Sequence, residues 1–328
     1  MKNIGRLSKR IGAGAGALLL VAVAAVVVKF YVVSPKSRPA QALTAPKTPE
    51  AIARGRYLVE NVAGCTGCHS PIREDLPGDV AVAGRVGAGR DFGGAPGATV
   101  HIRGSNITPD STTGIGVWTD GEIVRAIREG VDRDGRTLFP QMPYHTYGQH
   151  LGDGEALDIV AYLRTLPAIT NDAGRTIVAF PVSTFIRAVP QPVEASPPPA
   201  PSPSDKLARG EWLLQMASCH ECHDSVDARR QKIDGKALGG GFKFSLGARG
   251  YAIAPNISSD TATGIGSYAD ADILNAIEQG KGKDGRDLYS MPWSYYRGMT
   301  KEDKEDLVAA LRRAPAVVNM VPPSQITR

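Results

Sequence analysis

The feature that most constrains this 328-residue chain is a five-residue pattern, Cys-x-x-Cys-His, which occurs at Cys65–His69 and again at Cys219–His223. The two copies use all four cysteines of the chain. Two thiols one helical turn apart can reach the two vinyl groups on one porphyrin edge, and the adjacent histidine can bind the iron. The pattern therefore predicts two covalently bound haem c groups. The predicted attachment residues are Cys65, Cys68, His69, Cys219, Cys222 and His223.

A redox-active dithiol and a structural zinc site are the two alternative readings of a Cys-x-x-Cys pattern. A chance Cys-x-x-Cys need not be followed by histidine, yet both copies are. A zinc site would need a second ligand pair for each copy, and no pair is spaced that way. The sequence therefore favours haem over both alternatives.

A methionine lies at matching places in the two halves, Met142 before Pro143 and Met291 before Pro292. The proline restricts the methionine to extended backbone and so holds it in a loop, from which a thioether can reach across a haem. A gap-filling core methionine is the alternative. Because each methionine follows a matching Asp-Gly-Arg, we predict that Met142 and Met291 are the second iron ligands. Such six-coordinate haems pass single electrons without binding oxygen or peroxide.

Other residues could compete for the iron. Met299 is a rival to Met291, whereas Met216 lies too close to its haem motif. Four histidines are further candidates, but each has a methionine competitor, and polar surface positions explain them more simply. These histidines are His101, His145, His150 and His220.

The two halves of the chain are copies of one unit. Residues 106–138 align without a gap on residues 256–288, and about half of the aligned positions are identical. Each half ends in an amphipathic helix, predicted at 155–166 and at 300–313. Helix, haem motif, glycine-rich loop, short helix, methionine loop and helix is the layout of a small all-α cytochrome c domain.

The positive charge of the chain is confined to its start. Residues 1–49 contain eight basic and no acidic side chains, which leaves 30 basic and 33 acidic groups in the remainder. A protein that binds nucleic acid would be expected to show a clustered basic face. The net charge of −3 on the body therefore argues against a nucleic-acid partner.

The N-terminal segment reads as a membrane anchor. Four basic residues precede an uncharged run from Ile11 to Val28, and apolar residues resume after Lys29. This length is enough for one transmembrane helix, and the basic N-terminal flank predicts that this end stays in the cytoplasm. A cleaved signal peptide, with a small-x-small site at Ala22–Ala24, is the alternative. Either way, the haem domains are expected in the periplasm, and an uncleaved anchor places the chain in the bacterial inner membrane as a single-pass protein.

These observations predict an all-α chain with two tandem cytochrome c domains after a single N-terminal transmembrane helix. Proline-rich stretches suggest the boundaries between the parts. The expected divisions are an anchor at 1–33, a linker at 34–48, a first domain at 49–188, a proline-rich linker at 189–203 and a second domain at 204–328.

The chain resembles the multihaem cytochrome c subunits of membrane-bound periplasmic dehydrogenases, such as those of alcohol and gluconate dehydrogenases. The stretches that carry the resemblance are Asn106–Asp110, Thr113–Asp120, Asp134–Arg136 and Met142–Tyr144. The resemblance is looser in the second half, where Ser258, Ser259 and Tyr268 replace the usual residues. It implies that electrons enter from a dehydrogenase catalytic subunit and leave toward the quinone pool or a terminal oxidase. Members of the family usually carry three haem motifs, whereas this chain has two.

The expected function is therefore single-electron transfer by a membrane-anchored dihaem cytochrome that has no substrate chemistry of its own. A dihaem peroxidase-like oxidoreductase is the rival, and it would need one iron with a vacant or displaceable site. A structural membrane tether with vestigial haems is a third possibility, which a redox titration would test.

Overall fold

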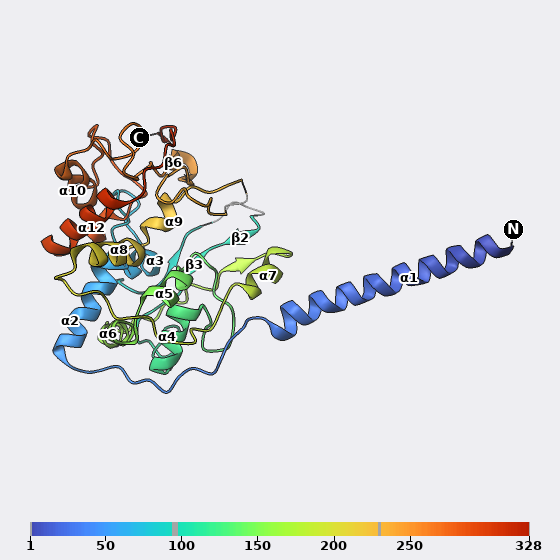
Figure 1. The fold of residues 1–328 in the computed structure, drawn as a ribbon. Helices are drawn as coiled ribbons and strands as arrows, with labels where there is room; N and C mark the ends of the chain where they lie inside the picture. The colour runs from blue at the N-terminus through green and yellow to red at the C-terminus, as the bar shows by residue number, and fades with distance from the viewer. Residues whose placement is uncertain (1, 94–97, 229–230, 328) are drawn as a thin grey trace.

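The computed structural model describes residues 2–93, 98–228 and 231–327. A long helix, α1 (Lys2–Val27), continues into the π-helical segment η1 (Val28–Val33) and projects from the body of the molecule (Figure 1). Within it, Gly14–Val33 is 20 residues long, with a mean hydropathy of 2.5, and so is long and apolar enough to cross a membrane. This helix lies where the sequence predicts an anchor.

We call residues 49–188 the first repeat. It begins with α2, continues as the π-helical segment η2, and then forms the short helix that carries the first haem motif. Its elements are α2 (Pro49–Tyr57), η2 (Leu58–Val62), α3 (Cys65–His69), β1 (Arg90–Asp91), β2 (Val100–His101), β3 (Arg103–Gly104), α4 (Asp120–Glu129), α5 (Tyr144–His150), α6 (Asp153–Leu163), β4 (Ile177–Val178), α7 (Val182–Phe185) and η3 (Ile186–Ala188).

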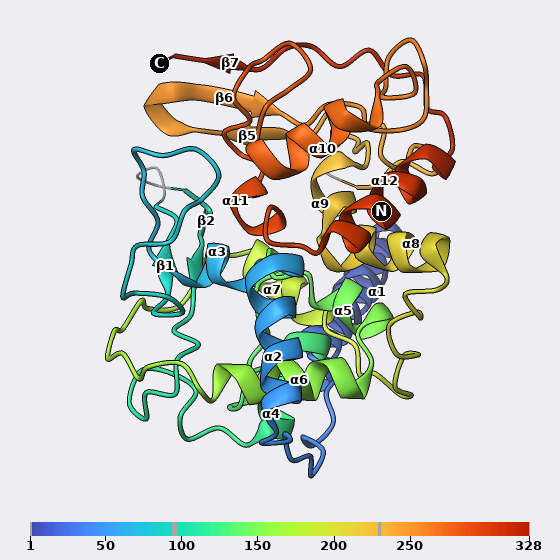
Figure 2. The same cartoon turned by 90° about the vertical axis from the view of Figure 1, so that its left-hand side faces the viewer.

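We call residues 204–328 the second repeat, which follows the same order of helices. Figure 2 shows it stacked above the first repeat. Its elements are α8 (Lys206–Met216), α9 (Cys219–His223), β5 (Lys243–Ser245), η4 (Gly247–Arg249), β6 (Gly250–Ile253), α10 (Asp270–Gln279), α11 (Trp293–Tyr296), α12 (Lys301–Arg313) and β7 (Gln325–Ile326).

Two long helices of each repeat cross at a glycine. Helix α2 packs on α6 and α8 packs on α12. A Cβ atom on Gly55 would lie 1.8 Å from the backbone oxygen of Asp158, and one on Gly210 would lie 2.0 Å from that of Asp306. Only glycine allows backbones this close. The aligned pairs Arg54-Gly55 and Arg209-Gly210 thus mark the same helix crossing in both repeats.

An arginine at the C-terminal end of α6, and another at that of α12, binds the loop that precedes α4 or α10. Arg164 donates to Asp120 and to the carbonyls of Ile115 and Trp118. In the second repeat, Arg312 donates in the same way to the carboxylate of Asp270 and to the carbonyls of Ile265, Gly266 and Tyr268. The duplication seen in the sequence therefore extends to the hydrogen bonds of the fold.

The prediction of an all-α fold is wrong. Helices make up 39% of the structure, and the described residues also contain seven short strands in three sheets. Strands β1 and β3 pair antiparallel, as do β2 and β4, and β6 pairs with both β5 and β7. Strands β1, β2, β3, β5 and β6 lie in the long segments after the haem motifs, whereas β4 follows α6 and β7 follows α12. Their backbone groups pair with each other because those segments, rich in glycine and lacking a helical pattern, must satisfy N–H and C=O groups outside helices.

The two proline-rich segments expected to be linkers are tied to the first repeat. Ala45 is buried and its amide donates to Asp120 at 2.8 Å, while Arg38 pairs with Glu129 at 3.0 Å. In the second segment, the amide of Ala200 donates to Glu155 at 2.9 Å. Both segments therefore run along the surface of the first repeat instead of hanging free.

One local difference separates the repeats. Eight positions lead from Tyr57 to Cys65, but seven lead from the equivalent Trp212 to Cys219. The first repeat accommodates its extra residue as the π-helical segment η2. A π-bulge absorbs one residue without ending the helix, so both haem motifs still follow their helix directly.

Candidate functional site

Each Cys-x-x-Cys-His motif forms a short helix after a residue in the left-handed conformation. Gly64 has φ 56° and ψ 34° before α3, and Ser218 has φ 55° and ψ 30° before α9. This turn breaks the preceding helix and starts a new one at the first cysteine. All four cysteines are free thiols in the structure, so none is used in a disulfide bond.

The two motif histidines have the same orientation. His69 Nδ1 lies 2.7 Å from the carbonyl oxygen of Ser105, and His223 Nδ1 lies 2.9 Å from that of Pro255. A carbonyl oxygen can only accept a hydrogen bond, so Nδ1 carries the proton in both rings. The lone pair that could bind a metal is therefore on Nε2. Burial lowers the pKa of both imidazoles, which favours the neutral form. A hydrogen-bonded Nδ1 and an open Nε2 are the arrangement of a metal-binding histidine.

The ionisation of the cysteines argues against a redox-active dithiol. Burial raises the pKa of Cys65 and of Cys219 to about 12 and that of Cys222 to about 11. Redox-active thiols have lowered pKa values, because the thiolate is the reactive form. A zinc site also finds no support: within the described ranges, no group of three or more His, Cys, Asp or Glu side chains could hold a metal ion.

The two methionine loops have the same backbone geometry. Pro143 has φ −80° and ψ 46°, and Pro292 has φ −81° and ψ 49°. Each loop is closed by a 2.8 Å hydrogen bond to the methionine carbonyl, from the amide of Tyr144 in one repeat and of Trp293 in the other. Met142 and Met291 are half-buried and pack against the core. Their role as iron ligands stays a prediction.

Three buried polar atoms beside the methionine loops fit a group with carboxylates. Thr137 Oγ1, Ser290 Oγ and Trp293 Nε1 have no hydrogen-bond partner in the part of the chain that the structure describes. Each can donate a hydrogen bond, and buried donors are nearly always paired in folded proteins. A haem carries propionate groups that accept such bonds. Free thiols, oriented histidines and unpaired donors together fit covalently attached haem c.

Each haem motif packs against the repeat that carries the other motif. A Cβ atom on Gly67, inside the first motif, would be 2.9 Å from the ring of Tyr295 in α11. The aligned contact in the opposite direction joins Glu221, inside the second motif, to Thr146 of α5, with 3.2 Å between Glu221 Oε1 and Thr146 Oγ1. The helix after each predicted methionine therefore packs on the haem motif of the other repeat. This relationship is a local pseudo-two-fold.

Side chains on the helices that precede the motifs also form hydrogen bonds to the other repeat. Tyr57 donates to Asp303 of the second repeat at 2.6 Å, and Trp212 donates to the carbonyl of His150 in the first at 2.8 Å. Asp303 also accepts two bonds of 2.9 Å from Arg209. The two motifs are thus held together by contacts from both repeats.

Three of the other four candidate histidines have protein partners. His101 pairs with Asp91 at 2.6 Å, and His220 Nδ1 lies 2.8 Å from Asp224 Oδ1. His145 contacts Gln149 at 2.8 Å. These contacts agree with polar structural roles. Met216 and Met299 are buried in the core.

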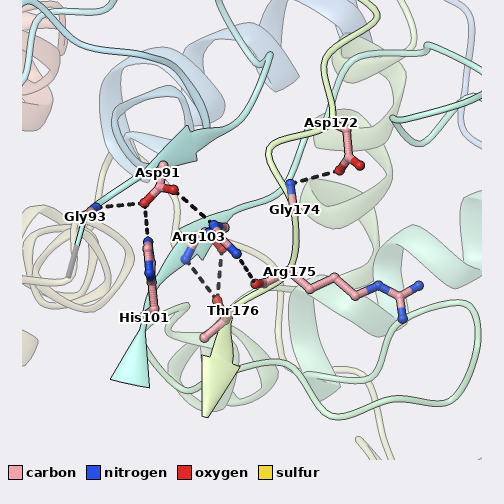
Figure 3. Close-up of polar contacts among 8 residues, drawn as sticks. All are labelled: Asp91, Gly93, His101, Arg103, Asp172, Gly174, Arg175 and Thr176. Carbon is pink, nitrogen blue, oxygen red and sulfur yellow. Dashed lines mark hydrogen bonds and ion pairs between the residues drawn. The ribbon is translucent and has the colours of Figure 1, made fainter. Parts of the chain in front are cut away.

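Figure 3 shows the cluster of polar contacts around Asp91 and Arg103. Asp91 accepts from His101 and Arg103, and the hydrogen bond from His101 is the main reason that its pKa falls to about 2. Arg103 also binds the carbonyl of Arg175 and exchanges hydrogen bonds with Thr176. The cluster fixes β3, which leads directly to the carbonyl of Ser105 that orients the motif histidine.

Sequence reasoning missed the residues that join the two motifs. They are Tyr57, Thr146, Trp212, Glu221, Tyr295 and Asp303. The available signal was the position of Thr146 and Tyr295, which both lie two residues after the aromatic residue that follows a Met-Pro pair.

Comparison with known proteins gives relatives over most of the chain, although no protein-family model matches. The cytochrome subunit of fructose dehydrogenase from Gluconobacter japonicus is 28% identical over 295 residues, which are 86% of this chain and 56% of that protein. The cytochrome c subunit of gluconate 2-dehydrogenase from Pantoea cypripedii is 30% identical over 246 residues, 70% of this chain and 51% of that protein. A diheme cytochrome c-type protein from Cereibacter sphaeroides is 26% identical over 261 residues, 77% of this chain and 83% of that protein.

These relatives confirm the resemblance that the sequence indicates, since several are cytochrome c subunits of dehydrogenases. The chain spans about half the length of the dehydrogenase cytochrome subunits that it matches. Cytochromes c carry haem c, which agrees with the chemistry of the two motifs.

Proposed function

Because this chain is a relative of the cytochrome c subunits of dehydrogenases, we propose that it is a membrane-anchored dihaem cytochrome that transfers single electrons in the periplasm. The donor would be a dehydrogenase catalytic subunit, and the acceptor would be the quinone pool or a terminal oxidase. The observation that carries the proposal is the pair of complete motifs, each with its histidine Nδ1 hydrogen-bonded to a carbonyl, so that the lone pair is on Nε2. The apolar stretch Gly14–Val33 supports an inner-membrane anchor.

In this proposal, each repeat would supply two cysteines and two axial ligands to one haem. Cys65 and Cys68 would form the thioether bonds of the first haem, and Cys219 and Cys222 those of the second. His69 with Met142, and His223 with Met291, would be the axial ligands. Haem c supplies reversible one-electron chemistry at its iron when it is bound. The protein supplies orientation through the carbonyls of Ser105 and Pro255.

The interface between the repeats supports transfer within the chain. Tyr295 lies on the first motif and Thr146 lies on the second, so each attachment site is part of the contact between the repeats. Tyr296, the residue after Tyr295, is half-buried and donates to the carbonyl of Ala217, two residues before the second motif, at 2.7 Å. Two sites that share one packed interface keep a constant separation, which a relay requires.

Replacement of the predicted ligands tests the proposal. Met142→Leu and Met291→Leu are each expected to lower the midpoint potential of one haem strongly, because the thioether favours reduced iron. Met216→Leu is the control, since Met216 is a core methionine with 0% exposure, and Met299→Leu, at 4% exposure, tests the rival of Met291 and is expected to leave both potentials unchanged. Unchanged potentials in both ligand variants would reject the ligand assignment. A high-spin haem in the unmodified protein would instead favour the peroxidase-like alternative.

The partner requires a separate experiment. The full chain should co-purify from membranes with a dehydrogenase subunit, and the substrate of that subunit should reduce the bound haem. If the haem of the purified membranes is reduced by no dehydrogenase substrate, the electron donor proposed here is wrong, even when the ligand assignment holds.

A further inference from the structure

The end of the anchor is fixed to the first repeat. The hydroxyls of Tyr31 and Thr184 lie 2.8 Å apart. Arg187 donates to the carbonyl of Phe30 at 2.7 Å and to that of Ser34 at 3.1 Å. These carbonyls are at the end of a helix, where oxygens lack partners and a cation is favourable. The anchor is therefore capped by a side chain of the first repeat.

An aromatic contact adds to this attachment. The ring of Phe30 is 8% exposed and meets the ring of Phe185 edge to face, with 5.4 Å between the centroids. Segments α7 and η3 both pack on η1. Polar and apolar contacts together fix the orientation of the first repeat relative to the anchor.

A group of apolar residues is exposed around this attachment point, and we call it the anchor-side patch. Phe180 is 79% exposed, Phe185 is 58% exposed and Ile177 is 57% exposed. Its members are Tyr31, Val32, Ile177, Phe180, Phe185 and Val189. Figure 1 shows α7 on the side of the body from which α1 projects. Exposed apolar patches of this kind mark interaction surfaces.

The charge of the surrounding chain suits a bilayer surface. Residues 173–193, which include α7, contain Arg175 and Arg187 but no Asp or Glu. The preceding anchor and its flank, residues 1–49, also lack acidic side chains. Arg175 pairs with Asp134 at 3.5 Å, so Arg187 is the basic residue nearest the patch. Aromatic side chains beside basic residues are typical of the membrane–water interface.

We propose that the anchor-side patch inserts into the outer interface of the membrane, with Phe180 and Phe185 among the lipid headgroups. This proposal rests on the membrane anchor of the proposed function. A helix of the length of Gly14–Val33 spans about 30 Å, the thickness of the hydrocarbon core. The patch begins at Tyr31, in the last turn of that span, so it lies near the depth of the headgroups. The first repeat then rests on the membrane in one orientation.

Site-directed spin labelling of the full chain in nanodiscs of phosphatidylcholine and phosphatidylglycerol tests the proposal. All four natural cysteines lie in the haem motifs, so one introduced cysteine gives one label. Phe180→Cys reports on the patch. Lys301→Cys is the matched control, because its side chain is 80% exposed on α12, on the opposite side of the body from α1 (Figure 1). Val26→Cys, within the anchor, reports whether the helix spans the bilayer.

The measurement is the accessibility of each label to oxygen, which concentrates in lipid, and to a water-soluble nickel chelate. The ratio of oxygen to nickel accessibility at residue 180 is expected to be severalfold higher than at residue 301. A ratio equal to that at residue 301, with residue 26 in lipid, overturns the proposal and leaves the anchor intact. A label at residue 26 that is accessible to nickel overturns the anchor itself. The haem absorption spectrum of each variant checks that it has folded.

Discussion

The ring of Tyr295 lies against Gly67, so a residue of the second repeat packs directly on the first haem motif. A Cβ atom at position 67 would come within 2.9 Å of this ring, and the contact leaves no room for a larger side chain. The spacing of the two haem motifs therefore depends on a position inside one of them.

Gly67→Val is expected to destabilise the protein by about 1–3 kcal/mol, because overpacking forces the ring to move. The measurement is the free energy of unfolding in urea, followed by circular dichroism. Gly154→Val is the control, since a Cβ atom there would meet nothing within 4 Å. In a Tyr295→Ala background the cost of Gly67→Val should largely disappear. Equal costs in both backgrounds would show that the two residues do not interact.

Arg164 should matter more than exposed arginines of the same repeat. It binds Asp120 and two backbone carbonyls, so Arg164→Ala leaves several acceptors without a donor. We expect a loss of about 2–3 kcal/mol in unfolding free energy. Arg175→Ala is the control, because its side chain is 66% exposed and its ion pair with Asp134 is 3.5 Å long, and it should change stability by less than about 0.5 kcal/mol. Comparable losses in both variants would contradict this role for Arg164.

The sequence was sufficient to predict helices that frame the haem motifs. The predicted short helix between the glycine-rich loop and the methionine loop is α4, which begins at a capping box of Thr119 and Glu122 and ends at Gly130 in the left-handed conformation. The predicted last helix at 300–313 also matches α12 within one residue. These features depend on neighbours in the chain, so local patterns reveal them.

The strands and the interface could not be predicted in the same way. Pairings such as Val100 with Val178 join residues far apart in the chain and are only two residues long, too short for an alternating pattern. The contact between Tyr295 and Gly67 depends on how the two repeats pack, which neither repeat's own sequence specifies. The domain boundaries and the iron ligands stay predictions.

Asp110 should make stability depend on pH in the acid range. Hydrogen bonds from Thr113, with further bonds from Thr170 and Thr112, hold the pKa of Asp110 at about 2. The usual pKa of an unfolded aspartate is about 3.9. A lowered folded pKa contributes stability that is fully present above the unfolded value and is lost as the pH falls toward the folded value.

Asp110→Ala should therefore be less stable than the unmodified protein at pH 5, and the difference should shrink between pH 4 and pH 2. Urea unfolding at pH 5, 4, 3 and 2.5 measures this difference. Asp234→Ala, at an exposed position, is the control. A difference that stays constant over this range would mean that the carboxylate charge of Asp110 contributes nothing to folding.

Asp303 joins an ion pair within the second repeat to a hydrogen bond from the first, so it can be used to measure the two contributions separately. Its side chain accepts two hydrogen bonds from Arg209 and one from Tyr57, and the residue is 6% exposed. Tyr57→Phe leaves the ion pair intact and is expected to cost about 0.5–1.5 kcal/mol in unfolding free energy. Arg209→Leu leaves a buried carboxylate without its cation and is expected to cost about 3–5 kcal/mol.

A second substitution separates two costs of Arg209→Leu, which are the loss of the ion pair and the burial of an unpaired carboxylate. Asp303→Asn added to Arg209→Leu removes that charge, so the double variant should be more stable than Arg209→Leu alone. Urea unfolding of the full chain measures all four proteins under the same conditions. If the double variant is the less stable of the two, Asp303 is not held in the interface by its charge, and its contribution must come from packing and the hydrogen bond to Tyr57.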